Sequence, residues 1–404
     1  MSKGGVFGRG FAPHRSLPNE EHRRVAVVEP MCFGLEHVPF NAALVAAVLE
    51  AFPAARVDVY GEEAHLTALN ELLTHTRPDR LDRVTWTPTR VPARDSRGWS
   101  RFVMTSQLLR DLDRRFDGLR PDALVFAAVD SGLIAMIKAR LFLAWKGLPV
   151  VAVFHQLLAS LEHGYSGRGG GLRAALAMPH PFTLKFLVLS TAIRDRLQRV
   201  APRMHRHVTS VDHPSLLGDV TTTATAPPSG LRFGFVGGGR GPKGLLAFTR
   251  LARELSASWG NAEFHIVGAV PPGVDRGELK GLEWSDSRLP LLEYVERIRG
   301  LTHVVWLGDP DHYGLVASGS LADVISLRIP LVCHDGPFVD HLFRRFGDIG
   351  FRGATVGHVR DEVRRLLSDF SIERDRLQRE RLAAARLALA PEASAEIIRR
   401  ALSY

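Results

Sequence analysis

The chain has 404 residues, of which 45% are hydrophobic and 24% are charged, and its formal net charge is +9. This length predicts two domains, and the composition is that of a globular protein rather than a disordered or fibrous one. Because no apolar run approaches the roughly 20 residues of a membrane span, a membrane-spanning protein is not expected.

Residues 1–22 combine Gly, Pro and charged residues without a central apolar block. This pattern predicts a mobile leader and is not that of a secretory signal. The two cysteines, Cys32 and Cys333, are far apart and show no metal-type spacing. We interpret them as buried thiols, and we expect a cytoplasmic protein without a metal site.

From residue 23 to residue 215, short runs rich in Val, Ile and Phe alternate with amphipathic stretches, which is typical of a parallel sheet built from strand and helix units. The expected strands are 25–29, 56–60, 84–87, 124–127, 150–155, 186–190 and 208–212. The expected helices between them include 41–51, 102–116, 133–145 and 192–200. This region therefore predicts a complete doubly wound domain.

Residues 216–230 are rich in Thr, Ala, Pro and Gly without an apolar period, which predicts an interdomain linker. After it, strands are expected at 231–236, 263–267, 303–307, 330–333 and 354–356, and the chain ends in helices at 373–389 and 393–402. Residues 231–404 thus predict a second Rossmann-like domain that includes the C-terminal helices. Ligands are expected in a cleft between the carboxyl ends of the two sheets.

The positive charge is concentrated in one segment. Residues 101–215 contain 16 Lys and Arg against 8 Asp and Glu, whereas residues 1–100 are balanced and residues 216–404 nearly so. An anionic membrane, a phosphorylated acceptor or nucleic acid would each suit such a patch. Because there is no RNA-binding sheet signature and no zinc-finger spacing, nucleic acid is not expected as a partner.

The helix expected at 133–145 is apolar, with Lys138, Arg140 and the following Lys146 interspersed. It is either a core helix between strands or part of a membrane-facing surface. In the second case it would act together with Arg168, Arg173 and Lys185.

The strand at 231–236 leads into a glycine loop that contains Gly237, Gly238, Arg240 and Lys243. Glycines let the backbone approach an anion, and the two cations would neutralise a diphosphate. Gly268, after the next strand, is included in this expected donor-binding set. The loop is neither a dinucleotide-binding Gly-x-Gly-x-x-Gly unit nor a P-loop, and a solvated glycine turn is the alternative.

A second loop places Ser318, Gly319 and Ser320 where a helix should begin, so that hydroxyls, backbone N–H groups and the helix dipole would point at one spot. Asp323 follows about one turn later and suits a sugar hydroxyl. The alternative is that Ser320 and Asp323 form a capping box that closes the helix without any ligand.

These two segments resemble the donor domain of GT-B glycosyltransferases, especially the retaining group 1 family. In that family a strand ends in Val-Gly-Arg, and a Lys-Gly pair opens the next helix. The spacing from glycine to lysine is kept between Gly237 and Lys243. Gly238 stands in place of the arginine, and Arg240 is the candidate that replaces it.

The family also has a Glu-x7-Glu pattern followed by Gly-x-Pro and a buried strand. Counted back from Pro330, Asp323 takes the place of the second acid, which binds ribose in the family, and Leu315 takes the place of the first. Arg328 stands where the glycine is usual. The segment is similar to a branch in which Tyr-x4-Ser-Gly-x3-Asp replaces the acidic pair, and the corresponding residues here are Tyr313, Ser318, Gly319 and Asp323. Asp309 or Asp311 would otherwise supply the lost carboxylate, although turn residues are the favoured interpretation.

In the first domain, residues 30–41 resemble the family's glycine loop and Glu-Arg-x3-Asn helix start, with Glu36 and Asn41 in register and Gly34 left from a glycine pair. His155 closes its strand where the family often places a histidine near the reacting sugar. His155, Glu36 and His37 are therefore the catalytic candidates. A structural histidine and an ordinary first helical turn are the alternatives.

The resemblance implies a glycosyltransferase that uses a nucleotide-diphospho-sugar as co-substrate and binds no further cofactor. Retention is favoured, while inversion would need a base such as His155 or Glu36. A lipid-linked or membrane-surface acceptor in polysaccharide or glycolipid assembly, with the enzyme peripheral on the inner membrane face, is the accompanying hypothesis. A sugar-nucleotide epimerase on the same plan and a non-catalytic sugar-nucleotide-binding protein are the alternatives.

Overall fold

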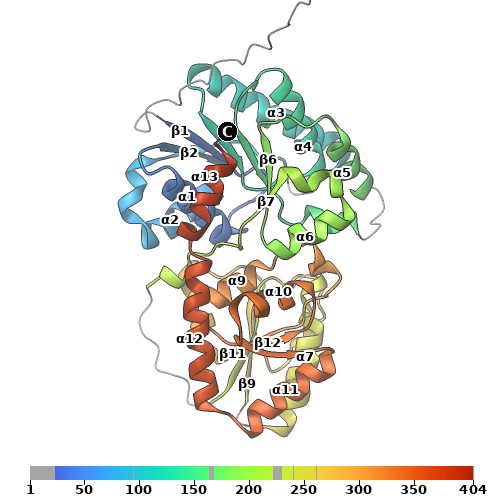
Figure 1. Cartoon of the computed structure of the whole chain (residues 1–404). Coiled ribbons are helices and arrows are strands. Elements are labelled where there is room, and N and C mark those ends of the chain that lie inside the picture. The colour runs from blue at the N-terminus through green and yellow to red at the C-terminus, as the bar shows by residue number, and fades with distance from the viewer. Residues whose placement is uncertain are drawn as a thin grey trace, which may run out of the picture.

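The structure, a computed structural model, describes residues 23–93, 95–162, 168–221, 230–239, 241–260 and 262–403, so the expected leader at 1–22 lies outside the described residues. The chain forms two α/β domains, one above the other in Figure 1. Each is built on a parallel sheet. The sheets have the strand orders β3-β2-β1-β4-β5-β6-β7 and β10-β9-β8-β11-β12-β13. Two doubly wound sheets confirm the predicted fold class.

The strands β1, β4, β5 and β6 in the middle of the first sheet are nearly continuous apolar runs, because helices cover both faces of the sheet. Its strands are β1 Arg24–Val28, β2 Arg56–Gly61, β3 Val84–Pro88, β4 Ala123–Phe126, β5 Val150–Val153, β6 Leu184–Val188 and β7 Val208–Ser210. Its helices are α1 Val38–Ala51, α2 Glu63–Thr76, α3 Gly98–Gly118, α4 Ser131–Phe142, α5 Arg168–Ala177 and α6 Thr191–Val200. Each expected strand of this half is present, with ends that differ by a few residues.

The second sheet contains β8 Arg232–Val236, β9 Glu263–Ala269, β10 Glu283–Ser285, β11 His303–Trp306, β12 Leu331–His334 and β13 Gly350–Gly353. Its helices are α7 Leu245–Ser258, α8 Leu291–Arg299, α9 Gly319–Ser326, α10 Pro337–Phe346, α11 Val356–Ser368 and α12 Ile372–Ala388. The edge strand β10 was not predicted, because its three residues are polar or only partly buried.

The last strand lies four residues before its predicted position, and residues 354–356 instead lead into α11, which begins at Val356. Two glycines interrupt the apolar run of β13 and hide it from a pattern of Val and Ile. The first of them is required by close packing, because a Cβ added to Gly350 would lie 2.0 Å from the carbonyl oxygen of Leu331. Thr355 then caps α11 by accepting a hydrogen bond from the backbone N–H of His358.

The last helix, α13 (Pro391–Ala401), packs along α1 of the first domain, although it follows the second domain in the sequence. Helix α1 is apolar on every side, and an all-apolar helix must be covered on every side to be stable. The sheet covers one side of α1, and α13 crosses back to cover another (Figure 1). The apolar cluster that results runs through both domains.

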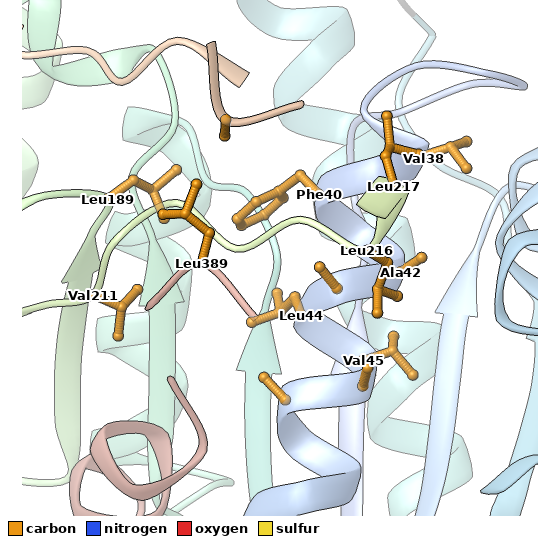
Figure 2. Packing of buried hydrophobic residues seen from close by; sticks show 14 of the residues in the cluster. Val38, Phe40, Ala42, Leu44, Val45, Leu189, Val211, Leu216, Leu217 and Leu389 are labelled. Carbon is orange, nitrogen blue, oxygen red and sulfur yellow. The ribbon is translucent and has the colours of Figure 1, made fainter. Parts of the chain in front are cut away.

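The predicted linker at 216–230 begins as a fixed segment. Leu216 and Leu217 are buried beside α1 (Figure 2), and just before them the N–H of Ser215 donates to the Leu389 carbonyl, in the connection between α12 and α13, at 3.0 Å. The N–H of Gly218 donates to Ser326 Oγ at 2.9 Å, and a Cβ on Gly218 would lie 2.6 Å from the Ser326 carbonyl oxygen. Residues 222–229 lie outside the described part of the chain.

Candidate functional site

The glycine loop after β8 is held close to the neighbouring strand. The N–H of Gly237 donates to the Val267 carbonyl at 2.9 Å, and a Cβ added to Gly268 would lie 2.5 Å from the Gly237 carbonyl oxygen. A Cβ added to Gly237, whose φ is 110°, would lie 2.7 Å from Lys243 Nζ and 3.3 Å from Ser320 Cβ. The loop backbone, Lys243 and Ser320 therefore meet at one point.

Lys243 reaches this point because the chain turns sharply after it. Gly244 has a φ of 82°, and a Cβ there would lie 2.2 Å from the Leu307 carbonyl oxygen, so only glycine fits between β11 and α7. Burial lowers the pKa of Lys243 to about 8, although the nearby negative charge of Asp323 opposes the shift. Gly238 is exposed with open space around it, and Arg240 is among the residues that the structure does not describe.

The start of α9 is capped by Ser318, whose Oγ accepts from the N–H of Leu321 at 3.4 Å and lies 3.1 Å from Ser320 Oγ. The alternative in which Ser320 and Asp323 form a capping box is therefore wrong, because the residue that caps α9 is Ser318, two positions before Ser320. Gly319 faces the first domain, since a Cβ there would lie 3.3 Å from His213 Nε2. The positive end of the α9 dipole is thus directed at the place where the two domains meet.

Asp323 is buried and binds two protein donors. Ser215 Oγ donates to one carboxylate oxygen at 3.2 Å, and the Tyr294 hydroxyl donates to the other at 3.3 Å. Burial raises the pKa of Asp323 to about 7, and these hydrogen bonds together with Lys243 oppose the shift. Because Ser215 belongs to the segment that enters from the first domain, Asp323 also links the two domains.

Other residues of this loop have supporting positions. Tyr313 is buried, and its ring packs edge-on against Trp306 with the ring centroids 4.9 Å apart. Leu315, at the position of the first acid, is buried in the apolar cluster of the first domain, so that position points into a core. Asp309 and Asp311 form an exposed turn in which the N–H of Asp311 donates to Asp309 Oδ1.

The first domain contributes three histidines grouped around Phe40. The Phe40 ring lies 4.2 Å from the ring of His155 and 4.9 Å from that of His213, and His37 lies 4.9 Å from His155. His155 follows β5 by two residues rather than ending it, and its Nε2 has no hydrogen-bond partner within the described parts of the chain. Burial lowers the pKa of each ring, so all three are neutral near pH 7.

His213 was not predicted. Its Nδ1 lies 3.1 Å from the Pro214 carbonyl oxygen, which can only accept, so Nδ1 carries the proton and the lone pair of Nε2 faces the start of α9. The signal that selected His155, a histidine just after a strand, also applies to His213, because β7 ends three residues before it. His37 has a φ of 51°, a conformation that is strained for a residue other than glycine.

Glu36 lies at the edge of this group. Its carboxylate accepts from the backbone N–H of Phe33 at 3.4 Å and pairs with Arg288 of the second domain at 3.4 Å. Arg288 lies in the loop between β10 and α8. The sequence did not predict Arg288 as a site residue, because it did not predict the strand that precedes this loop. The positive charge of Arg288 is, after burial, the largest influence that lowers the pKa of His37 to about 3, and the charge of Lys243 acts in the same direction.

Asn41 has a structural role in the loop around Gly34. Its amide donates to Glu29 Oε2 at 2.8 Å and to His65 Nε2 at 2.9 Å, and His65 Nδ1 donates to the Gly34 carbonyl. The ligand atoms of Glu29, Cys32 and His65 lie within 4.8 Å of one another, a spacing that suits a metal ion. Both ring nitrogens of His65 are already engaged, so hydrogen bonds account for the cluster.

The segments from the two domains leave little space beside His213. A cavity of about 10 Å³ lies between α9 and the ends of β6 and β7, lined by His213, Asp212 and His341 among others. Such a cavity holds about one water molecule. Asp212 joins the domains on this side, because its carboxylate lies 3.4 Å from His341 Nε2 and 3.2 Å from Arg345 Nε.

No family model matches the chain, and no curated protein matches it in sequence. Solved structures do match it. HepE of Anabaena, solved with UDP and glucose, superposes with a TM-score of 0.66 at 13% identity, over 95% of this chain and 100% of that one. The chain has the GT-B fold. An α,α-trehalose 6-phosphate synthase from Burkholderia multivorans matches with a TM-score of 0.62 at 12% identity, over 94% of this chain and 96% of that one. The UDP-GlcNAc 2-epimerase of Neisseria meningitidis matches with a TM-score of 0.57 at 11% identity, over 94% of this chain and 99% of that one.

Gly238 is exposed and Arg240 is not described, and the other predicted site residues of this GT-B chain separate into three groups. The group that meets at one place comprises Gly237, Gly268, Lys243, Gly319, Ser320, Ser318, Asp323, His37 and His155. Glu36 is paired at the edge, and Tyr313 supports the loop from within the core. The sequence missed His213, Arg288, Ser215 and Tyr294, which reach the site only through tertiary contacts.

Proposed function

We propose that the chain is a glycosyltransferase that moves a sugar from a nucleotide-diphospho-sugar to an acceptor hydroxyl. One observation carries this proposal: an anion-binding set from the second domain, built from Gly237, Lys243 and the start of α9, meets the histidine group of the first domain. The similarity to HepE, which was solved with UDP and glucose, supports the choice of a nucleotide sugar.

The chemistry proposed for this site is stabilisation of the leaving group. Lys243 and the N–H groups at the start of α9 stabilise negative charge that develops on the diphosphate as the sugar departs. Phe40 keeps the region between the histidines apolar, which strengthens these interactions by excluding water. We assign Asp323 to the ribose, although Tyr294 or Ser215 must then share its oxygens with the ligand.

We favour a retaining reaction, in which the leaving phosphate itself takes the proton of the acceptor hydroxyl. In the inverting alternative, we prefer His155 as the base, because its Nε2 has no hydrogen-bond partner among the described residues. Glu36 is the weaker candidate, since its carboxylate already pairs with Arg288.

We further propose transfer of a hexose to a polysaccharide or glycolipid precursor, by a cytoplasmic enzyme that is peripheral on the inner membrane face. The excess of eight positive charges in residues 101–215 supports an acceptor at an anionic surface. Among the described residues, no helix combines the length and apolarity that crossing a bilayer requires.

The experiment that tests the proposal is a thermal-shift screen of nucleotide sugars. A ligand at 100 times its Kd stabilises the folded state by about 2.7 kcal/mol, so the correct donor must raise the Tm. Lys243→Ala should reduce this stabilisation to about half or less, whereas Lys280→Ala, which changes an exposed lysine of the same domain, should retain it. If no nucleotide sugar raises the Tm, the proposed function is wrong.

Two other functions have specific support. The similarity to a UDP-GlcNAc 2-epimerase favours an epimerase, which would convert its nucleotide sugar with no acceptor present. The buried Leu315 in place of an acid favours a protein that binds a nucleotide sugar without turning it over. Product analysis with and without a panel of acceptors separates these functions from a transferase.

A further inference from the structure

Helix α4 is apolar on its outward side as well as on the side that faces the sheet. Its buried side consists of Leu133, Ile134, Ile137 and Leu141. Ala139, Phe142 and Leu143 are exposed, and Met136 is partly exposed, at spacings that place them on the outward side. Phe142 is 53% exposed and Leu143 is 78% exposed. The outward side of a helix on a soluble domain is normally polar, so this face is unusual.

Two further exposed aromatic side chains lie at the start of α3, on the same flank of the first domain. Trp99 and Phe102 are 76% and 48% exposed, and their rings stack with centroids 5.2 Å apart. Arg101 ties the start of α3 to the start of α4, because its Nε lies 2.6 Å from Oδ2 of Asp130, the N-cap of α4. We call Trp99, Phe102, Met136, Ala139, Phe142 and Leu143 the α4 face. Figure 1 shows α3, α4 and α5 together on this flank of the first domain.

Cations surround the α4 face, and most nearby acids are already paired. Asp111 pairs with Arg114, Asp113 with Arg140, and Asp130 with Arg101. Exposed cations around the face are Arg97, Arg110, Arg120, Lys146 and Arg173. Of these, Arg120 and Arg173 donate to backbone carbonyls, which leaves their charge uncompensated. Asp117 is an exposed acid at the end of α3.

The structure corrects the choice of cations made from the sequence. Lys138 is fully buried, and its Nζ donates to the carbonyl oxygens of Ala175, Leu176 and Met178, so it closes the C-terminal end of α5. Arg140 is paired with Asp113, and the side chain of Arg168 is not described. Lys138 and Arg140 therefore stabilise the domain, and the charge at the surface comes from other residues.

We propose that the α4 face binds an anionic lipid bilayer. The exposed aromatic and aliphatic side chains enter the interfacial layer, and the surrounding cations meet the lipid headgroups. A polar or acidic partner would not suit the apolar side chains, and an apolar partner would not suit the cations. An anionic bilayer suits both.

This face also has a suitable position relative to the site. Helix α4 begins after β4, at the same edge of the sheet where His155 follows β5. It ends at the opposite edge, before β5. Docking along the whole of α4 would lay this flank of the domain on the bilayer, with the edge that carries His155 at one end of the contact, where a lipid-carried acceptor is presented. This last step rests on the proposed function, whereas bilayer binding itself does not.

The test is co-sedimentation of the full chain with vesicles of phosphatidylcholine, with and without phosphatidylglycerol. We expect binding only to the anionic vesicles, and loss of binding at high salt because surface charges are then screened. The joint change Phe142→Asp and Leu143→Asp should weaken binding by at least about tenfold, since two apolar side chains no longer enter the interface and two acids are added. Leu377→Asp with Leu387→Asp, exposed leucines of α12, is the matched control that should bind as wild type.

Absence of binding to anionic vesicles at low salt overturns the proposal, as does unchanged binding of the Phe142 and Leu143 variant. If that variant instead converts a wild-type dimer into a monomer, the face is a protein interface and the proposal is wrong. The thermal shift with nucleotide sugars, measured without vesicles, should be the same in wild type and variant. A failure of bilayer docking can thus be distinguished from a failure of the proposed enzyme activity.

Discussion

Lys243 should make nucleotide binding depend on pH in a range where a surface lysine would not. Burial lowers its pKa to about 8, so its positive charge is lost as the pH rises through 8. About ten in eleven molecules carry the charge at pH 7, and about one in eleven at pH 9. If only the charged form holds the diphosphate well, the Kd of a nucleoside diphosphate should rise about tenfold between these values.

The assay is isothermal titration calorimetry at pH 7, 8 and 9 and constant ionic strength, with the nucleoside diphosphate chosen by the thermal-shift screen. Phosphate groups complete their ionisation near pH 6, so the ligand does not titrate in this range. Lys243→Arg keeps its charge throughout, so the tenfold rise in Kd should be absent. Lys243→Ala should weaken binding by roughly 10- to 150-fold, the value of a charge-assisted hydrogen bond of about 1.5–3 kcal/mol, again without the tenfold rise.

A wild-type Kd that stays constant from pH 7 to pH 9 would refute this reasoning. So would a tenfold rise that persists in Lys243→Ala, since another group would then be responsible. Lys280→Ala serves as the control for the general loss of a positive charge and should follow the wild-type profile.

Three further predictions concern stability and the shape of the site. Arg328 is exposed with a φ of 62°, so Arg328→Gly should raise the free energy of unfolding in urea by roughly 0.5–1 kcal/mol, and Arg328→Ala should not. Gly268→Ala should lower the free energy of unfolding by roughly 1–3 kcal/mol and weaken nucleotide binding, because the added Cβ would meet the Gly237 carbonyl. Gly281→Ala is the control: Gly281 has a φ of 82° but open space around it, so this variant should show backbone strain alone and unchanged nucleotide binding. Burial raises the pKa of Asp323 to about 7, so between about pH 4 and pH 7 the carboxyl keeps its proton in the folded state but loses it in the unfolded state, and stability falls as the pH rises. Relative to wild type, Asp323→Asn should therefore gain about 2–3 kcal/mol between pH 5 and pH 8 in urea unfolding, and equal pH dependence of the two proteins would contradict the assignment.

The sequence alone determined the two-domain α/β plan and the local shape of the anion-binding loops. The strands of the central sheets are buried on both faces and appear as apolar runs, so alternation with amphipathic helices was sufficient to find them. The conformations of Gly237 and Gly244 depend on neighbours within a few residues or on the adjacent strand, and glycine marks both in the sequence. Ser318 and Lys243 were found for the same reason, because helix caps and turns are determined by short-range interactions.

Only the tertiary structure decided which residues from distant segments meet. Helix α13 lies on α1, Ser215 and Tyr294 bind Asp323, and His213 faces Gly319, although each pair is separated by tens to hundreds of residues. These contacts arise because an apolar surface or a buried carboxylate must be covered or hydrogen-bonded by whatever the fold brings beside it. Spacing in the sequence cannot specify that neighbour. The outward apolar face of α4 differs from these examples because it stays exposed. Only the tertiary structure shows that no other described element covers it.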